Sequence, residues 1–440
     1  MSQVKTLAIV GAGPVGLAAA AHALERGLTP IVLERGPEAG HAIRQWAHVR
    51  MFSTWSLNID AAAARLLRET GWTPPNPLDH PTGGDLLAHY VAPLAAVPAL
   101  RAALRTSARV RSIGRRGLDK VKDAGRSARP FELVVDGPAG AYRVTADAVI
   151  DASGTWFQPN PAGSDGRAAP GEAENAERIA YAMPEIAGAA RDAYAGKTVA
   201  VLGGGHSAIG TLIELDGIAG WIVWLYRGAD LEKAFGGGGA DKLAARGALG
   251  TTIAGLVRRG RIAAETEFRL AAIERAGGRL RLRAEDGRAI EADRLIAATG
   301  FRPDLDMLRE VRLDLDPALE CPRALGPLID PNLHSCGTVR PHGAKELAQP
   351  EAGFYLAGMK AYGRAPTFLL ATGYEQVRSI VAALAGDAEA AAKVELVLPE
   401  TGVCAGPKPK IRLPAATGAA SGGCCPARAP ALTSASADTR

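Results

Sequence analysis

Residues 6–16 read TLAIVGAGPVG, an apolar run that passes directly into a glycine-rich turn. The run predicts a buried strand, and the Ala-rich stretch from Val15 to Glu25 predicts the helix that follows it. Gly11, Gly13 and Gly16 have the G-x-G-x-x-G spacing, which allows a tight turn, close approach of a diphosphate and close packing of helix on strand. Because the free N–H groups at the start of a helix attract phosphate, this stretch predicts a dinucleotide-binding unit.

An acidic residue supports this interpretation of the first turn. The apolar stretch Pro30–Leu33 predicts a second strand, and Glu34 follows it, 23 residues after Gly11. A carboxylate at that distance can accept hydrogen bonds from the hydroxyl groups of a nucleotide ribose. We therefore assign Glu34 to the cofactor site, together with its neighbour Arg35 and with Pro14 of the turn.

A second copy of this unit begins at residues 198–208, which read TVAVLGGGHSA. The pattern is again an apolar strand, a turn of the form G-x-G-x-x-A and an apolar helical stretch. The residues assigned to this second cofactor site are Gly203, Gly205, His206, Ser207 and Ala208.

The two units differ at the position that follows the second strand of each. Tyr226 stands 23 residues after Gly203, and Arg227 follows it, so the second unit lacks the acidic residue of the first. A carboxylate would repel a 2′-phosphate, whereas an arginine beside an uncharged residue can pair with it. The second unit is therefore predicted to bind NADPH in preference to NADH, with Arg227 on the phosphate.

Both units also close with the same type of strand. Residues 147–154 (DAVIDASG) parallel residues 293–300 (DRLIAATG), because each runs from Asp through an apolar strand to a small-residue turn that ends in Gly. The residues of these turns that we assign to the cofactor sites are Ala152, Gly154, Thr299 and Gly300.

The order of the motifs predicts how the chain is divided. Residues 301–390 contain no glycine-rich turn of their own, so we expect them to return to the first unit. The predicted fold is α/β, with two Rossmann-like dinucleotide-binding domains, the second inserted in the first. Residues 155–196, rich in Pro, Gly and Ala, are expected to form the crossover. The predicted segments are 1–155 (first domain, first part), 156–295 (second domain), 296–395 (first domain, second part) and 396–440 (a disordered tail).

Composition excludes several classes of protein. The 440 residues are 47% hydrophobic and 22% charged, as in ordinary globular chains. The net charge of +5 is spread over scattered Lys and Arg rather than gathered in a basic patch, so we expect no nucleic-acid partner. No apolar run has the ~18 residues that a membrane span needs, and no signal sequence is visible, so a cytoplasmic protein is expected. An odd count of five cysteines argues against a disulfide framework.

Taken together, the two glycine-rich units, Glu34 and the closing turns resemble the two-dinucleotide-binding-domain flavoproteins. The resemblance implies that the first unit holds FAD and the second NADPH. The turn of residues 203–208 is similar to that of flavin-containing (class B) monooxygenases, and residues 50–53 (RMFS) resemble the Phe-Ser element that those enzymes place beside the flavin. Residues 353–359 (GFYLAGM) look like the C-terminal FAD element, with a helix expected from about Thr367. This resemblance adds Phe52, Gly358, Met359 and Thr367 to the cofactor residues.

The resemblance further implies a monooxygenase reaction. NADPH would reduce FAD, and the reduced flavin would react with O₂ to form a C4a-peroxyflavin that oxygenates a small molecule. The predicted flavin-side residues are Gln45, Ser53 and Asn58 for polar contacts, Arg50 for charge, and Trp46 and Phe52 for exclusion of water. In one departure, no His lies between Gly154 and Gly203, where these enzymes carry an F-x-G-x-x-x-H fingerprint. A homodimer is expected.

The cysteines leave an alternative open. No cysteine precedes Cys321, so the C-x-x-C and C-x-x-x-x-C pairs of flavoprotein disulfide reductases are absent, and we rank the monooxygenase first. The alternative is an NADPH-dependent reductase of thiol or metal and metalloid substrates that uses Cys424 and Cys425. These two, with Cys404, could also bind a soft ion such as trivalent arsenic. The Cys424-Cys425 pair resembles the tail of bacterial flavoproteins associated with arsenic-resistance genes. A flavin-binding sensor with little turnover is a third hypothesis.

Two further segments allow more than one interpretation. Residues 332–343 (NLHSCGTVRPHG) hold two His, a Cys and an Arg between turn residues, so they could form a structural loop, a substrate site or a metal site. The run Gly236–Gly239 could be a flexible connection or a lid over NADPH.

Overall fold

Two five-stranded parallel sheets organise the chain. The computed structural model describes residues 4–236, 244–333, 339–366 and 368–396. The first sheet has the order β16-β7-β1-β2-β3, and each pairing in it is parallel. Its strands are β1 (Thr6–Val10), β2 (Thr29–Leu33), β3 (Leu104–Arg105), β7 (Ala148–Asp151) and β16 (Phe354–Leu356). Because β16 pairs with β7, the chain returns to the first sheet after it has formed the second.

The second sheet repeats the order of the first. It runs β11-β10-β9-β15-β8, so that β9, β10, β11 and β15 occupy the places of β1, β2, β3 and β7. Its strands are β8 (Ile179–Tyr181), β9 (Thr198–Leu202), β10 (Trp221–Leu225), β11 (Ala263–Glu265) and β15 (Arg294–Ala297). The edge strand β8 comes from the segment 155–196, which was expected to be only a crossover. That expectation was incomplete, because three residues in it pair with β15.

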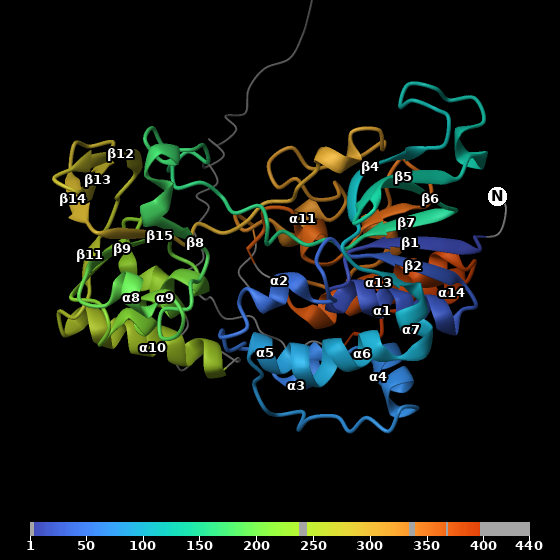
Figure 1. Cartoon of the computed structure of the whole chain (residues 1–440), viewed down its shortest axis with the longest axis horizontal. Coiled ribbons are helices and arrows are strands. Elements are labelled where there is room, and N and C mark those ends of the chain that lie inside the picture. The colour runs from blue at the N-terminus through green and yellow to red at the C-terminus, as the bar shows by residue number, and fades with distance from the viewer. Residues whose placement is uncertain (1–3, 237–243, 334–338, 367, 397–440) are drawn as a thin grey trace, which may run out of the picture. The chain divides into compact units, whose positions relative to one another are not determined.

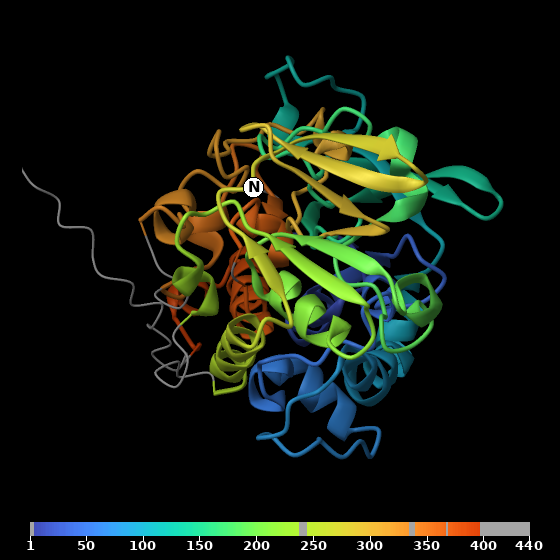
Figure 2. The same ribbon diagram turned by 90° about the vertical axis from the view of Figure 1, so that its left-hand side faces the viewer.

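Each half also carries a three-stranded antiparallel sheet, which in chain order lies between β3 and β7 in the first half and between β11 and β15 in the second. These strands are β4 (Arg109–Arg115), β5 (Phe131–Gly137) and β6 (Gly140–Ala146) in the first half, and β12 (Leu270–Ala276), β13 (Arg279–Ala284) and β14 (Ala289–Ala292) in the second. Figure 2 shows the yellow antiparallel strands of the second half as a sheet separate from the green parallel strands β9 and β10. The internal repeat is therefore larger than the two motif pairs visible in the sequence.

Helices cover the parallel sheets. The four longest are α1 (Pro14–Glu25), α9 (His206–Leu215), α10 (Ala244–Arg258) and α13 (Leu370–Leu384). The shorter ones are α2 (His41–Arg44), α3 (Trp55–Asn58), α4 (Ala61–Arg68), α5 (Gly83–Leu86), α6 (Ala92–Ala96), α7 (Pro98–Ala103), α8 (Arg191–Tyr194), α11 (Gly326–Ile329), α12 (Ala344–Leu347) and α14 (Ala388–Ala392). Short segments of other helix types are η1 (Leu87–Val91), η2 (Arg126–Ala128), η3 (Ala173–Arg178), η4 (Leu231–Phe235), η6 (Asp306–Leu308) and η7 (Gly358–Tyr362).

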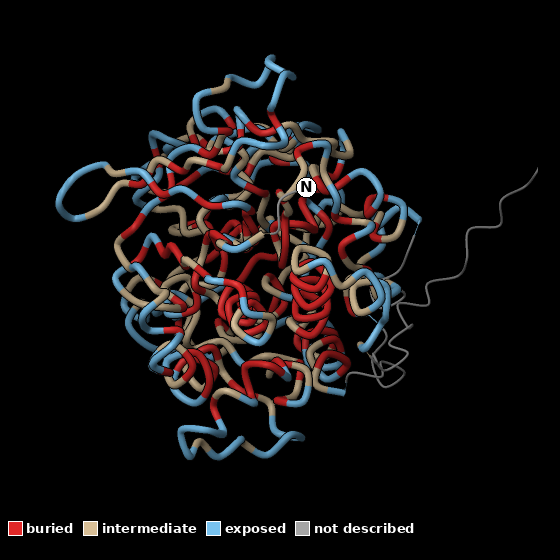
Figure 3. The backbone as a smooth tube through the Cα atoms, turned by 90° about the vertical axis from the view of Figure 1, so that its right-hand side faces the viewer, coloured by how far each residue is buried: buried red, intermediate tan, exposed pale blue. Residues whose placement is uncertain are grey.

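The core follows from this layering. In the first half, α1 and α13 lie on one side of the parallel sheet and β4–β6 on the other (Figure 1). Strand β7 is buried along its whole length, as expected for a parallel strand covered on both faces. In the second half, one buried cluster joins the sheet to α9 and α10, and another joins it to β12–β14. Figure 3 shows buried residues concentrated in the interior strands and helices, with exposed residues in the loops.

The predicted fold class, an α/β fold with Rossmann-like units, is confirmed. The helix expected from about Thr367 is α13, which begins three residues later, at Leu370. No helix among the described residues is both long enough and apolar enough to cross a membrane.

Candidate functional site

The first glycine-rich turn needs glycine at two places and leaves open space at a third. Gly11 has a φ of +97°, and a Cβ there would lie 2.8 Å from the carbonyl oxygen of Ala152. A Cβ on Gly16 would lie 1.9 Å from the Gly11 carbonyl oxygen, so helix α1 could not pack against the turn. A Cβ on Gly13, in contrast, would meet nothing within 4 Å. Gly13 therefore lies where a ligand, rather than the protein, can approach the backbone.

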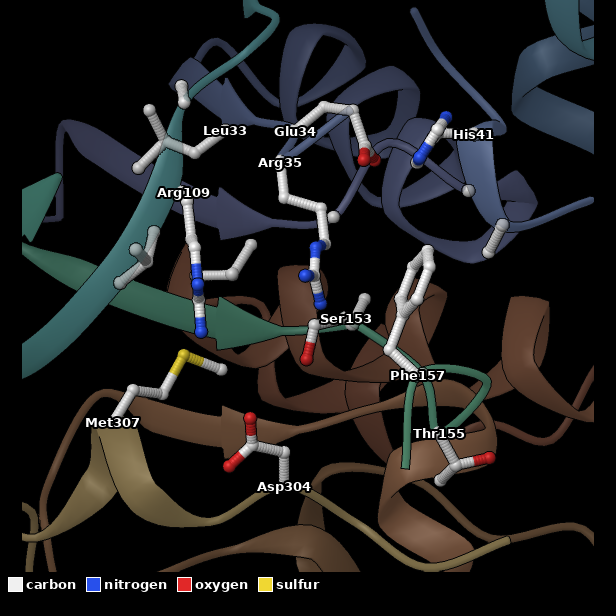
Figure 4. Close-up of a pocket in the computed structure, with 18 of the residues that line it drawn as sticks. Leu33, Glu34, Arg35, His41, Arg109, Ser153, Thr155, Phe157, Asp304 and Met307 are labelled. Carbon is white, nitrogen blue, oxygen red and sulfur yellow. The ribbon is translucent and has the colours of Figure 1, made fainter. Parts of the chain in front are cut away.

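A cavity of about 520 Å³ lies at the carboxyl ends of strands β1, β2 and β7 (Figure 4). This edge of a parallel sheet is where ligands of such folds bind. The predicted cofactor residues that line the cavity are Gly11, Gly13, Glu34, Arg35, Ala152 and Gly154. We call this group of residues, with helix α1, the first cradle. Its open backbone at Gly13 and its volume fit the dinucleotide predicted for it, FAD.

Glu34 is the buried acidic residue of the first cradle. Its Oε2 accepts a hydrogen bond from the Ala12 N–H at 2.8 Å, and its Oε1 accepts one from the Gly36 N–H at 2.8 Å. These two bonds fix the carboxylate beside the turn, and each oxygen keeps a further lone pair for a ribose hydroxyl. The Gly11 N–H donates to the Leu33 carbonyl oxygen at 2.8 Å, so the turn and the strand that carries Glu34 are held together.

The cavity wall also contains residues that the sequence analysis missed. The Arg35 guanidinium lies 4.1 Å from the centre of the Phe157 ring, and the His41 ring stacks on the same ring at 5.8 Å. In Figure 4, Arg35 and Arg109 extend into the cavity from one side, opposite Asp304 and Met307. The missed lining residues include His41, Arg109, Arg111, Asp136, Ser153, Thr155, Phe157, Gln158, Asp304, Asp306 and Met307. They come from distant segments, and only Ser153 lies within a motif that the sequence analysis had identified.

The second glycine-rich turn, with helix α9 and the turn Ala298–Gly300, forms a second cradle of the same design. Gly203 has a φ of +140°, and a Cβ there would lie 2.3 Å from the Ala298 carbonyl oxygen. Its N–H donates to the Leu225 carbonyl oxygen at 3.2 Å, as the Gly11 N–H does to Leu33. A Cβ on Gly205 would meet nothing within 4 Å, so this backbone too is open to a ligand. His206 and Ser207 begin α9 at this point.

The two cradles differ in the residue that follows the second strand. Tyr226 stands where Glu34 stands in the first half, and its ring lies across the turn, since a Cβ on Gly204 would be 2.5 Å from it. Arg227 is exposed, and its Nη1 donates to the Ser164 carbonyl oxygen at 3.1 Å. The remaining N–H groups of an exposed guanidinium can bind a phosphate.

The chain segments that connect the two halves also join the second closing turn. Thr299 Oγ1 donates to the Asn160 carbonyl oxygen at 2.8 Å, and the Asn160 N–H donates to the Gly300 carbonyl oxygen at 2.9 Å. The rings of Trp156 and Phe301 stack beside them at 5.0 Å. Asn160 and Phe301 were not predicted, because neither residue belongs to a recognised motif.

The predicted flavin-side loop meets the second cradle. The Phe52 ring lies 5.4 Å from the His206 ring, which is at the N-terminus of α9. Gln45 Oε1 accepts a hydrogen bond from Trp156 Nε1 at 2.9 Å. Trp46 packs on α5, since a Cβ on Gly83 would be 2.6 Å from its ring. The structure therefore brings Phe52 to the junction of the two cradles and gives Trp46 a packing role.

The other polar residues predicted at the flavin form hydrogen bonds with other groups of the protein. Ser53 Oγ donates to Asn58 Oδ1 at 2.9 Å, and Asn58 Nδ2 donates to the Ser53 carbonyl oxygen at 3.0 Å. Both side chains are buried, so their mutual bonds stabilise the loop. Arg50 is exposed, and its Nη1 donates to the His80 carbonyl oxygen at 2.6 Å. It lines a second cavity of about 720 Å³, which also includes Trp55.

Thr82 and Asp85 form a capping box at the start of α5. The hydrogen bond that the Thr82 N–H donates to Asp85 Oδ2 lowers the pKa of Asp85, because it favours the charged form of the carboxyl group.

The C-terminal element packs against α1 through glycine. Gly358 has a φ of +69°, and its N–H donates to Gln376 Oε1 at 2.7 Å. Gln376 Nε2 donates to His342 Nε2 at 2.8 Å, and His342 Nδ1 donates to the Arg340 carbonyl oxygen at 3.0 Å. Burial lowers the pKa of His342, which keeps the ring neutral in this network. Met359 is half-buried and packs on the core.

The 332–343 segment thus contributes a buried structural histidine, His342. Several other predicted residues lie outside the described part of the chain. They are Thr367, His334, Cys336, Cys404, Cys424, Cys425 and Gly237–Gly239. Among the residues that the structure describes, no group of three or more His, Cys, Asp or Glu could hold a metal ion.

Cys321 is the cysteine that the described residues include. It is buried, and burial raises the pKa of its thiol to about 12. A thiol with such a pKa is almost entirely protonated at neutral pH and is a poor nucleophile. Cys321 is also absent from the lining of the first cradle's cavity.

Comparisons with known proteins agree with this architecture. A family model described as pyridine nucleotide-disulphide oxidoreductase matches residues 5–335, more than half of the chain. Among solved structures, bacillithiol disulfide reductase from Bacillus cereus is 20% identical, with a TM-score of 0.65 over 87% of this chain and 99% of that one. The flavin-containing monooxygenase from Stenotrophomonas maltophilia is also 20% identical, with a TM-score of 0.53 over 88% of this chain and 99% of that one. At these identities the likeness establishes the fold. A search of curated proteins finds no match.

Proposed function

This chain belongs to the pyridine nucleotide-disulphide oxidoreductase family, and we propose that it is an NADPH-dependent FAD monooxygenase that acts on a small molecule. It is an oxidoreductase with FAD and a nicotinamide nucleotide as cofactors. When bound, FAD accepts a hydride from the nicotinamide, and its reduced form reacts with O₂ to transfer one oxygen atom to the substrate, the other leaving as water. The observation that carries the proposal is a pair of open cradles in which Phe52 of the predicted flavin loop contacts His206 of the second cradle, in a chain whose sequence has no cysteine before Cys321.

In this proposal, the residues at the junction of the two cradles contact the bound cofactors and keep water away from them. Phe52 is half-buried, and its ring lies 5.4 Å from the exposed His206 ring. Gln45, on the same loop, accepts a hydrogen bond from Trp156. We infer that bound cofactors complete the cover over these partly exposed side chains. A dry junction supports oxygen transfer, because water there would divert the reduced cofactor into peroxide release.

The cysteine positions favour oxygen over a disulfide as the electron acceptor. The sequence contains no cysteine between the first glycine-rich turn and Cys321. The Cys321 thiol is buried, and its raised pKa of about 12 suits it poorly to thiol–disulfide exchange.

The charges of the second cradle support NADPH as the hydride donor. Tyr226 replaces the acidic residue, and the exposed guanidinium of Arg227 follows it. A 2′-phosphate at this place gains charge-assisted hydrogen bonds and meets no carboxylate at position 226.

A second candidate is reduction of a disulfide or metalloid through Cys424 and Cys425. The family description and the fold shared with bacillithiol disulfide reductase favour it. An arsenic-related substrate belongs to this candidate or to the first. Cytoplasmic location and association of two copies are further expectations.

One set of assays separates the two candidates. We would supply the purified flavoenzyme with NADPH in air and a thioether such as methyl phenyl sulfide, and measure NADPH loss, oxygen uptake, peroxide and sulfoxide. We expect equal consumption of NADPH and O₂ with sulfoxide formed, and the same result for the C424S/C425S variant. Peroxide as the sole product with every substrate would count against a monooxygenase. Rapid anaerobic reduction of 5,5′-dithiobis(2-nitrobenzoate), lost in C424S/C425S, would establish the second candidate.

A further inference from the structure

A fully buried ion pair lies directly behind the first cradle. Lys360 Nζ is 2.6 Å from Asp151 Oδ2, and both side chains have 0% exposure. Lys360 Nζ also donates to Ser153 Oγ at 3.1 Å, and Ser153 Oγ donates to Asp151 Oδ1 at 2.6 Å. Ser153 is exposed and lines the cavity that contains Gly11 and Gly13. The pair is thus one side chain away from the space for the FAD diphosphate.

The internal repeat shows that the fold does not require this pair. Asp151 is the last residue of β7 and pairs with Val10, the last residue of β1. The equivalent residue of the second sheet is Ala297, which ends β15 and pairs with Leu202 of β9. An alanine therefore closes the same type of strand in the same type of sheet. Of the two cradles, only the first has the charged pair at this position. We therefore attribute the pair to the ligand of the first cradle.

Loss of Lys360 and loss of Asp151 should affect FAD binding differently. Burying an ion pair costs desolvation energy, and removing one partner leaves an uncompensated charge behind. Among the described residues, Asp151 Oδ2 has no hydrogen-bond partner and depends on the Lys360 ammonium. Without Lys360, the carboxylate would repel the diphosphate of FAD across Ser153. Without Asp151, the ammonium would attract it.

We propose that Lys360 is a positioning residue of the flavin site. It neutralises Asp151 and holds Ser153 at the cavity wall, so that the closing turn of the first cradle presents no negative charge to the FAD diphosphate. The inference depends on FAD binding in the first cradle and is independent of whether the electron acceptor is oxygen or a disulfide.

The test compares FAD dissociation from four forms of the holoenzyme: the native protein, K360M, D151N and K360M/D151N. Flavin fluorescence released on dilution gives the dissociation constant of each. We expect K360M to raise it about tenfold or more, because a buried carboxylate is left unpaired. D151N and the double variant should stay within about threefold of the native protein, because neither retains that carboxylate. A purely structural role would weaken FAD binding in both single variants.

A control uses a buried cluster of ion pairs in the first half. Arg115 Nε is 2.7 Å from Glu351 Oε1 and Arg126 Nη2 is 2.6 Å from Glu351 Oε2, and none of the three residues lines the cavity. R115M should lower the melting temperature and leave the FAD dissociation constant unchanged. Equal weakening by K360M and D151N, or unchanged affinity in K360M, would overturn the proposal. If K360M does not fold, weak FAD binding by the double variant would overturn it as well.

Discussion

The first and second cradles share a backbone and differ in their side chains. In both, the first glycine has a positive φ and packs on the closing turn, and the second glycine leaves its backbone open to a ligand. The first cradle adds buried charge, with Glu34 beside the turn and Asp151 behind it. The second has Tyr226 and Ala297 at these places and an exposed Arg227. The comparison teaches that one backbone design can carry two different sets of charged side chains, and we propose that these charges select a different nucleotide in each cradle.

The largest expected effect concerns the third position of the glycine motif, where the first cradle has no room for a Cβ atom and the second cradle has an alanine. G16A should destabilise the protein by about 3 kcal/mol or more and abolish FAD retention, because its Cβ would lie 1.9 Å from the Gly11 carbonyl oxygen. A208G in the second cradle should cost only about 1 kcal/mol, the ordinary helix penalty of glycine. Urea denaturation and the flavin content of purified protein measure both effects. Equal destabilisation by the two variants would contradict the structural difference between the turns.

The next effect concerns the open glycines and should separate ligand binding from folding. G13A should weaken FAD binding about 100-fold, because a methyl group would occupy the space through which the diphosphate approaches the backbone. The melting temperature of the apoprotein should not change, since a Cβ at Gly13 meets no protein atom within 4 Å.

G205A is the matched variant in the second cradle. It should raise the KM for NADPH and leave the flavin content unchanged, because its Cβ is equally free of protein contacts. Loss of FAD from G205A would show that the assignment of the cofactors to the two cradles is wrong.

A smaller effect is expected from the charge that distinguishes the nicotinamide cradle. R227A should raise the KM for NADPH about tenfold, because charged hydrogen bonds contribute about 1.5–3 kcal/mol and exposure reduces that value. The KM for NADH should change by less than about twofold, since NADH has no 2′-phosphate. Steady-state reduction of the flavin with each nucleotide provides the measurement. If NADH were the better donor for the native protein, the assignment of Arg227 would fail.

The smallest effect is a pH dependence of stability in the first half. His342 is buried and its pKa is lowered, so the unfolded chain binds a proton more readily than the folded one. Stability from this residue is therefore complete above its ordinary pKa near 6.5 and falls as the pH drops below that value. H342Q should flatten this part of the stability curve, as measured by urea denaturation between pH 7 and pH 5. An unchanged slope would mean that other groups cause the acid sensitivity.

Much of the fold was predictable because its signals are local. The run Thr6–Val10 is strand β1, and the helix expected from Val15 begins one residue earlier, at Pro14. The positions of the turn glycines, of the strand ends and of the residue 23 positions after the first glycine are set by short-range backbone geometry. The spacing of residues in the sequence therefore reveals them. Strand β8 was missed because three residues in a Pro- and Gly-rich segment carry too little periodicity to predict a strand.

The candidate site was less predictable than the fold. Ser53 and Asn58 were expected at the flavin, and the structure shows their side chains bonded to each other. Phe157 and His41 were missed, although their stacked rings line the cavity. The sequence shows which side chains are polar. It does not show which groups they contact, because that depends on which distant segments the fold brings together.

Local spacing was therefore sufficient to identify two nucleotide-binding units, their order and the acidic and basic residues that distinguish them. Folding in three dimensions was needed to bring Phe52 against His206 and to bury Lys360 beside Ser153, 207 residues away along the chain. Backbone turns obey short-range steric rules that a sequence displays directly. Long-range contacts between side chains arise only when packing places their segments together, and the environment they create sets the charge behind a cofactor.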